Sequence, residues 1–241
     1  MKKTIFICLM FISVAVMGQE KKTVWDYPVK PGMKEWQDCN SPEEIYEMLQ
    51  VPEDILKKID TKSLIQICLN YPAPTIFYIF NTPQQGFEGF YRQFNGIREL
   101  MSRKDAGYFL IEKYADMSLD GFSPLWTLEN QGAYINKFYY IELFLVQPVI
   151  LNLLSKSERK VLLIESLKKF DLKDSQKDLF GSLNRSATVR TIARTLYVEN
   201  RLTVIKTNSL PDTIVASLES GQLVNIDVQS VYQQAKLRIH E

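Results

Sequence analysis

The sequence has 241 residues but only one histidine, His240, next to the C-terminus. Catalytic centres of the Ser-His-Asp and Cys-His kinds need a histidine base, and chain ends usually fray, so neither kind is expected. Zinc sites need several histidine or cysteine ligands, which are also lacking. Nucleotide-binding glycine motifs, the Gly-x-Ser-x-Gly turn and the EF-hand loop are absent as well. The sequence therefore predicts no cofactor and no metal site.

Cysteine is almost as scarce, with three residues in the whole chain. Cys8 lies in the apolar run at the N-terminus, which leaves Cys39 and Cys68 for the rest of the protein. Two cysteines do not make a disulfide framework, but in an oxidising compartment they are able to form one bridge. Alternatively, Cys68 is a buried free thiol, because it lies in the apolar stretch LIQICL.

Glycine and proline number only ten each, and no Ser/Gly linker or low-complexity tract divides the chain. With 46% hydrophobic residues the chain is able to bury a sizeable core, and we expect one continuous domain. A basic excess is also missing, since 29 Lys and Arg face 28 Asp and Glu. Nucleic-acid-binding domains are usually basic, so we expect no nucleic-acid partner.

The N-terminus carries the clearest positive signal. Lys2 and Lys3 precede an apolar run over residues 5–17, and small or polar residues follow it. This order is typical of a secretory signal peptide, and the run is shorter than the about 20 residues that span a bilayer. We therefore predict that 1–18 is a signal peptide, cleaved near Gly18–Gln19. The mature protein is then periplasmic or extracellular, without stable membrane insertion. A buried N-terminal helix is the alternative.

The rest of the chain repeats the spacing of amphipathic helices. Residues 19–40 contain prolines without any periodicity and are predicted to form an extended arm. Helix starts follow, of which the clearest is Ser41-Pro42 with two glutamates behind it. Residues 131–154 are apolar on nearly every side and indicate a central helix, broken at Pro148. For 41–241 we predict a single all-α domain of about ten to twelve short helices, stacked in an irregular, helical-repeat-like array.

Four aromatic residues recur at i, i+3, i+4 and i+7 in a predicted helix that begins at Thr82, which places them on one side. They are Phe87, Phe90, Tyr91 and Phe94. Such a stripe usually faces the core, and we expect that here; an exposed platform for a sugar or peptide is the alternative. Gly86 and Gly89 would let a neighbouring helix approach the buried side closely.

Among the carboxylates, Glu142 is the best candidate for chemistry because it lies in the most apolar predicted helix. A buried carboxyl group has a raised pKa and is able to act as a general acid. The alternatives are pairing with an arginine or a backbone donor, or a place on the helix surface. Glycosidases need two carboxyl groups about 5–10 Å apart, and the sequence indicates no second one.

Three arginines suggest an anion site in a later helix. Arg190 and Arg194 are one helical turn apart, with Arg185 nearby, and this spacing suits two guanidinium groups that hold one anion. A solvated basic face is the alternative interpretation.

Several stretches carry a resemblance to a known group of proteins. They are WDYPVKPGMKEW, LIQICLNYP and GFYRQFNGIRELMSRKDA, followed by the later helical half. With the signal peptide in front, the chain resembles secreted all-helical proteins of Bacteroidota, a family of unknown function. The resemblance covers most of the mature chain and implies no activity or functional residue. In that setting Asp212-Thr213-Ile214 resembles a short O-glycosylation sequon, with Thr213 as the acceptor.

Two functions from different classes remain. The first is an exported, non-enzymatic helical module that interacts with a protein or glycan partner, indicated by the helix pattern and the missing catalytic base. The second is a carboxylate-based hydrolase acting on glycans or cell-wall material, indicated by export, aromatic content and Glu142. Two converging acids in a pocket would favour the hydrolase, and a long surface without acids would favour the module.

Overall fold

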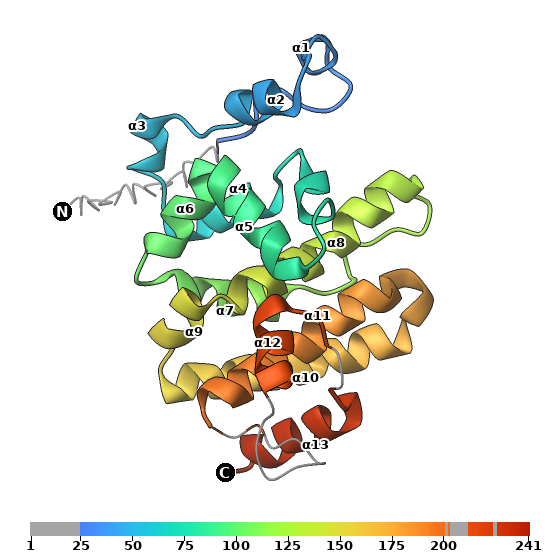
Figure 1. Cartoon of the computed structure of the whole chain (residues 1–241). Helices are drawn as coiled ribbons and strands as arrows, with labels where there is room; N and C mark the ends of the chain where they lie inside the picture. Colours follow the sequence, from blue (N-terminus) through green and yellow to red (C-terminus); the bar gives the residue numbers. More distant parts are fainter. Residues whose placement is uncertain (1–24, 201, 203–211, 224–225) are drawn as a thin grey trace, which may run out of the picture.

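The computed structural model describes residues 25–200, 202, 212–223 and 226–241, without the side chains of 212–214. Every regular element among them is a helix, which confirms the predicted all-α fold (Figure 1). The predicted signal peptide, 1–18, lies outside the described residues. The helices up to residue 116 are α1 (Lys34–Gln37), α2 (Pro42–Met48), α3 (Glu53–Leu56), α4 (Thr61–Leu69), the 3-10 helix η1 (Pro74–Phe77), α5 (Pro83–Gln93), α6 (Asn95–Ser102) and α7 (Ala106–Asp116). Those that follow are α8 (Leu128–Leu145), α9 (Pro148–Leu153), α10 (Lys156–Ser175), α11 (Lys177–Val198), α12 (Asp212–Ser220) and α13 (Val228–Ile239).

Side-chain caps begin many of these helices. Ser41 accepts a hydrogen bond from the backbone N–H of Glu44 at 3.3 Å, and proline follows it at the first helical position, as the sequence predicts. Thr82 caps α5 in the same way. At α10, Ser155 and Glu158 form a reciprocal capping box. Because a capping side chain satisfies an N–H group that lacks a helical partner, these starts are encoded locally.

Three helices are longer than the short units that the sequence predicts. α8 has 18 residues, α10 has 20 and α11 has 22. α11 consists of two helical segments joined at Gly181, whose φ of 66° suits glycine. α10 and α11 pack side by side, and α8 packs against α11. In the described part of the chain, no helix combines the length and the apolar character needed to cross a membrane.

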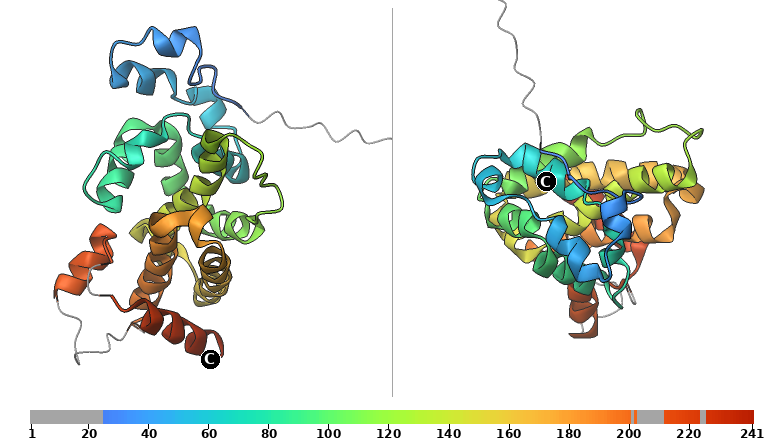
Figure 2. Two further views of the ribbon diagram at one scale, coloured as in Figure 1. Left: turned by 90° about the vertical axis from the view of Figure 1, so that its right-hand side faces the viewer. Right: turned by 90° about the horizontal axis from the view of Figure 1, so that it is seen from above.

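The helices succeed one another along the length of the molecule. α1 to α3 lie at one end, α13 lies at the other, and the long pair α10 and α11 lies next to α13 (Figures 1 and 2). One cluster of buried apolar side chains fills the space among α4 to α9, and a second lies among α10, α11 and α13. α12 departs from this order because it contacts α5 as well as α11. Apart from α12, position along the stack follows position in the sequence.

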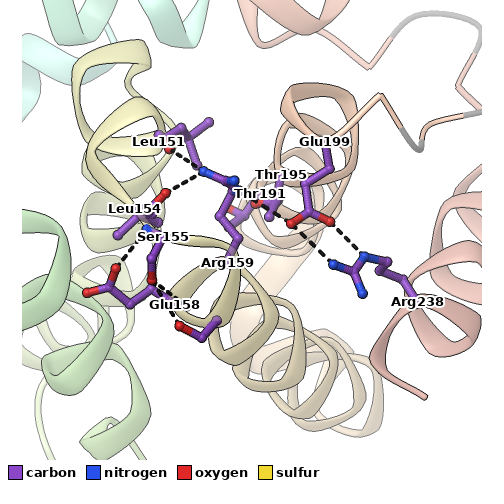
Figure 3. Close-up of polar contacts among 10 residues, drawn as sticks. Leu151, Leu154, Ser155, Glu158, Arg159, Thr191, Thr195, Glu199 and Arg238 are labelled. Atoms are coloured by element: carbon purple, nitrogen blue, oxygen red, sulfur yellow. Dashed lines mark hydrogen bonds and ion pairs between the residues drawn. The ribbon is translucent and has the colours of Figure 1, made fainter. Parts of the chain in front are cut away.

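A buried carboxylate near the end of α11 joins the two clusters (Figure 3). Glu199 accepts hydrogen bonds from Arg159 Nε of α10 at 3.3 Å and from Arg238 Nε of α13 at 2.7 Å. Arg159 Nη1 also donates to the backbone oxygens of Leu151 and Leu154 at the end of α9. The side chain of Glu199 is 5% exposed. One acid therefore ties four helices together.

The predicted arm is extended in only part of its length. Residues 25–33 form no helix, but α1 adds a single turn before Ser41. Tyr27 is buried, and its hydroxyl donates to the carbonyl oxygen of Ile67 in α4 at 3.0 Å. Its ring also packs edge-on against Tyr71. Burial of one aromatic ring thus anchors this segment to the main core.

The aromatic stripe of α5 faces the core, as predicted, except for one ring. Phe90 and Phe94 are fully buried and Phe87 nearly so, whereas Tyr91 is 41% exposed. At 3.6 residues per turn, Tyr91 lies about 100° around the helix from Phe90, at the edge of the stripe. The glycines permit close approach, as predicted, although the neighbour of Gly86 is the 3-10 helix η1 and that of Gly89 is the ring of Phe80.

Candidate ligand-binding groove

The most polar point of the interior is the fully buried carboxylate of Glu142 in α8. Its Oε1 accepts hydrogen bonds from the Tyr114 hydroxyl at 2.6 Å and the Thr188 hydroxyl at 2.7 Å. Lys173 Nζ donates to both carboxylate oxygens, at 2.9 and 2.8 Å, and to the backbone oxygen of Asn184. Burial lowers the pKa of Lys173, and the neighbouring Glu142 counteracts part of that change.

These hydrogen bonds distinguish among the roles that the sequence leaves open for Glu142, namely a general acid, a paired carboxylate or a surface residue. The carboxylate is paired, but with a lysine rather than with an arginine or a backbone donor, and it does not lie on the helix surface. α7, α8, α10 and α11 each contribute one side chain. Among the described residues, no other carboxylate bonds to these groups. The arrangement satisfies buried polar groups and sets the helix positions, and it lacks the second acid of a glycosidase.

The two arginines of the predicted anion site do not form a solvated basic face. Arg190 is 2% exposed and Arg194 is 8% exposed, both within α11. That alternative is therefore wrong, because α12 packs against α11 here. Arg185 has a different partner, because its Nη2 forms an ion pair with Asp174 at 2.5 Å. Arg190 and Arg194 are thus a pair of buried guanidinium groups.

Cys39 and Cys68 are both free thiols, so the bridge considered from the sequence is absent. Cys68 is buried in α4, where burial raises its pKa well above the ordinary value, and this matches the alternative of a buried thiol. Cys39 follows α1, and its Sγ bonds to the carbonyl oxygen of Glu35 at 3.2 Å. Thr213 lies in the first turn of α12, where its side chain is outside the described atoms.

A surface hollow of about 500 Å³ lies between α1 and α2 and is open to solvent. Its lining is Glu35, Asp38, Cys39, Glu44, Glu47 and Met48. The acids here are exposed side chains, and in the described part of the chain no three His, Cys, Asp or Glu residues converge to hold a metal ion. Nothing in this hollow selects a ligand.

A smaller and more enclosed pocket, about 170 Å³, lies where α4, α7 and α8 meet. It is called the inner pocket. Two lysines, Lys113 of α7 and Lys137 of α8, supply its positive charge. The other lining residues are Gln66, Leu69, Asp116, Met117, Ser118, Tyr134 and Phe138. The inner pocket thus combines apolar walls with a few polar groups, as small binding sites usually do.

A second hollow, the outer pocket, adjoins the first along α8 and has a volume of about 360 Å³. Tyr134 and Lys137 line both pockets, so the two are neighbours, and together they are called the groove. Trp126 adds a ring whose centroid is 5.7 Å from that of Tyr134. Leu125 and Leu128, on either side of the Trp126–Thr127 pair, are 94% and 86% exposed. Two exposed leucines therefore flank this part of the chain next to Trp126.

The two lysines of the groove are not bonded to a carboxylate in the part of the chain that the structure describes. Neither forms a hydrogen bond or an ion pair with another residue in the described part of the chain. Burial lowers the pKa of Lys137, and the nearby ammonium group of Lys113 lowers it further. Asp116 lines the inner pocket as well, but it forms no ion pair with either lysine. A bound anion would relieve the repulsion between the lysines.

Hydrogen bonds hold the loop between α7 and α8 in shape, although it projects from the body of the molecule (Figure 2). Tyr134 donates its hydroxyl proton to the backbone oxygen of Ser118 at 2.8 Å. Gln131 Nε2 donates to the backbone oxygens of Pro124 and Trp126 at 3.1 and 2.8 Å. These bonds fix the loop beside Trp126 and Tyr134, and a fixed binding surface reduces the ordering cost of binding.

Sequence reasoning missed this groove, although one signal for it was present. Lys137 lies in the most apolar helix and has no acidic residue three or four positions away. A helical lysine usually gains such a partner or faces solvent, so an isolated one in an apolar helix marks a place to inspect. Lys113 and Trp126 become neighbours of Lys137 or Tyr134 only through the fold.

Comparison of the chain with protein-family models, curated proteins and solved structures finds no match.

Proposed function

We propose that the protein is an exported, non-enzymatic interaction module whose groove binds a protein segment carrying a carboxylate beside apolar side chains. The observation that carries this proposal is the pair of unpaired lysines, Lys113 and Lys137, inside a groove with aromatic walls. Cationic groups without partners favour an acidic ligand, and buried aromatic anchors supply most binding energy at protein interfaces.

A protein partner fits the groove better than a glycan does. Sugars stack on aromatic faces, and Trp126 and Tyr134 offer such faces. The exposed residues close to Trp126 in the chain, however, are the aliphatic Leu125 and Leu128, which match apolar side chains of a partner. The alternative function, a hydrolase acting on glycans or cell-wall material, is favoured by no observation on the described residues, since Glu142 is enclosed and fully bonded.

Selection of peptides from a random display library on the immobilised mature protein tests the proposed function. We expect selected peptides to combine Asp or Glu with large apolar residues. Their affinity should fall roughly tenfold or more in Lys137→Gln and in Trp126→Ala, since one lost contact of about 1.4 kcal/mol is tenfold. Lys104→Gln is the matched control. Lys104 is an exposed lysine just before the first residue of α7, whereas the groove residue Lys113 lies in the last turn of α7.

Peptides that bind the variants as well as the parent protein would refute the role of the groove. If no peptide is selected and the protein binds acidic oligosaccharides on a glycan array, the partner is a glycan and not a protein.

Export is the second part of the proposal and has its own test. It rests on the basic start and the apolar run before residue 18. N-terminal sequencing of protein recovered from the producing cells should give a chain that lacks residues 1–18. A protein that retains Met1 and stays in the cytoplasm would overturn the periplasmic or extracellular location.

A further inference from the structure

Arg190 and Arg194 form an unusual feature of the interior. Both side chains project from α11, are 2% and 8% exposed, and form no ion pair with any carboxylate among the described residues. The Nε and Nη2 atoms of Arg190 are buried without any hydrogen-bond partner. Buried arginines are normally paired, because an ion removed from water without a counter-charge costs several kcal/mol.

The surrounding charges do not neutralise the pair. Glu142, a buried carboxylate whose charge acts on Arg190, is already bonded to Lys173. The hydroxyl of Tyr139 interacts with Arg190, but it is a neutral group. Burial lowers the pKa of Arg190, and burial together with Arg190 lowers the pKa of Arg194 to about 10. Among the described residues, therefore, no carboxylate bonds to either arginine.

The neighbouring backbone comes close to Arg190. A β-carbon on Gly221, just after α12, would lie 2.5 Å from Arg190 Nη1 and 3.2 Å from Pro83. The C-terminal end of α12 contributes only a partial negative charge. Glu219, on the same helix, is an exposed residue that attracts Arg194 without forming an ion pair. Arg194 retains some contact with solvent, so an ion is able to approach from its side.

We propose that Arg190 and Arg194 form a binding site for a phosphate-type oxyanion, either free phosphate or the phosphate group of an ester. Guanidinium groups bind phosphate oxygens through paired N–H donors, and two of them one helical turn apart match a doubly charged oxyanion. The site lies between α11 and α12, whereas the groove lies where α4, α7 and α8 meet. It is therefore independent of the proposed peptide groove.

Thermal melting of the mature protein in inorganic phosphate tests the site, with sodium chloride added to equal ionic strength and acetate as a singly charged comparison. Phosphate should raise Tm with the logarithm of its concentration once that exceeds Kd, by roughly 5–10 °C at a hundred times Kd, while acetate should not. Glycerol 3-phosphate distinguishes the two sources: a larger rise than with phosphate assigns the site to an ester, and a smaller rise assigns it to the free ion.

Arg190→Met and Arg194→Met separate binding from a structural role. Each variant should lose the Tm rise in phosphate but melt at or above the parent temperature without phosphate, because it lacks an unpaired buried charge. Arg92→Gln, an exposed arginine of α5, should keep the full rise. If Arg190→Met fails to fold, Arg194→Met and calorimetric titration of the parent with phosphate decide the question.

Two results would overturn the proposal. One is a Tm of the parent that phosphate raises no more than acetate does at equal ionic strength. The other is an equal rise in the parent and the methionine variants, which would indicate general stabilisation by salt.

Discussion

At the scale of single residues, side chains of similar hydrophobicity have different roles because the fold buries them to different depths. Phe90 is fully buried and lies against Phe77, Phe94 and Phe144, with ring centroids 4.7 to 6.1 Å apart. Tyr108 of α7 is 56% exposed, although its spacing with Ile111 and Ala115 suggests a shared apolar face. Periodicity identifies a helix, but it locates the buried face less accurately.

Phe90→Ala should destabilise the protein by about 3–5 kcal/mol, the usual cost of deleting a buried ring. For a chain of this size each kcal/mol lowers Tm by roughly 2–4 °C, so thermal melting should show a large drop. Tyr108→Ala is the control, and its free energy of unfolding should change by about 0.5 kcal/mol or less. A Phe90→Ala melt within a degree or two of the parent would contradict the core assignment.

Lys173→Met should destabilise the protein by about 3–5 kcal/mol, because it leaves the Glu142 carboxylate buried without its cation. The double variant Glu142→Gln/Lys173→Met should recover part of the loss, since no charge then remains in the network. Urea unfolding of the two single variants and the double variant measures the coupling energy. Simple additivity would show that the ion pair of this network has no specific energetic role.

At the scale of elements, glycines set how closely neighbouring helices approach. A β-carbon on Gly86 of α5 would lie 2.6 Å from the carbonyl oxygen of Phe77, which is backbone and has little freedom to move. One on Gly132 of α8 would meet nothing within 4 Å. The two helical glycines therefore have opposite roles: the first permits packing against η1, and the second only weakens its own helix.

Gly86→Ala should destabilise the protein by about 1–3 kcal/mol through overpacking, whereas Gly132→Ala should stabilise it by about 0.5–1 kcal/mol through helix propensity. Chemical denaturation of both variants measures how the same substitution changes the free energy of unfolding at a closely packed site and at an open one. Equal effects at the two sites would mean that η1 does not pack against α5 as described.

At the scale of the whole molecule, the two apolar clusters depend on shared links to act as one unit. Glu199 is such a link, because Arg159 and Arg238 bind it while Arg159 also binds the end of α9 (Figure 3). Removing this acid would leave two arginines without their counter-charge and would loosen α13 from the stack.

Glu199→Ala should cost about 3 kcal/mol and increase amide hydrogen exchange in α13 more than in α5. Glu53→Ala removes an exposed acid, 3.8 Å from Lys57, and should cost at most about 1 kcal/mol. Uniform loss of protection throughout the chain in Glu199→Ala would show instead that the two clusters unfold together.

The sequence by itself determined the fold class, many helix starts and several core residues, because these depend on local chemistry. Caps such as Ser41 and the i, i+3, i+7 spacing of Phe87, Phe90 and Phe94 act within a few residues of the chain. The helix break at Pro148, the first residue of α9, was predictable from the sequence for the same reason.

Only the tertiary structure decided which polar residues meet. The hydrogen bonds of Glu142 join residues that are 28 to 46 positions apart in the sequence. Lys113 and Lys137 line one pocket because α7 and α8 pack together. The burial of Arg190 and Arg194 likewise depends on α12, which folds back against α11. Electrostatic partners act through space at a few ångströms, and no local pattern encodes which distant segment supplies them.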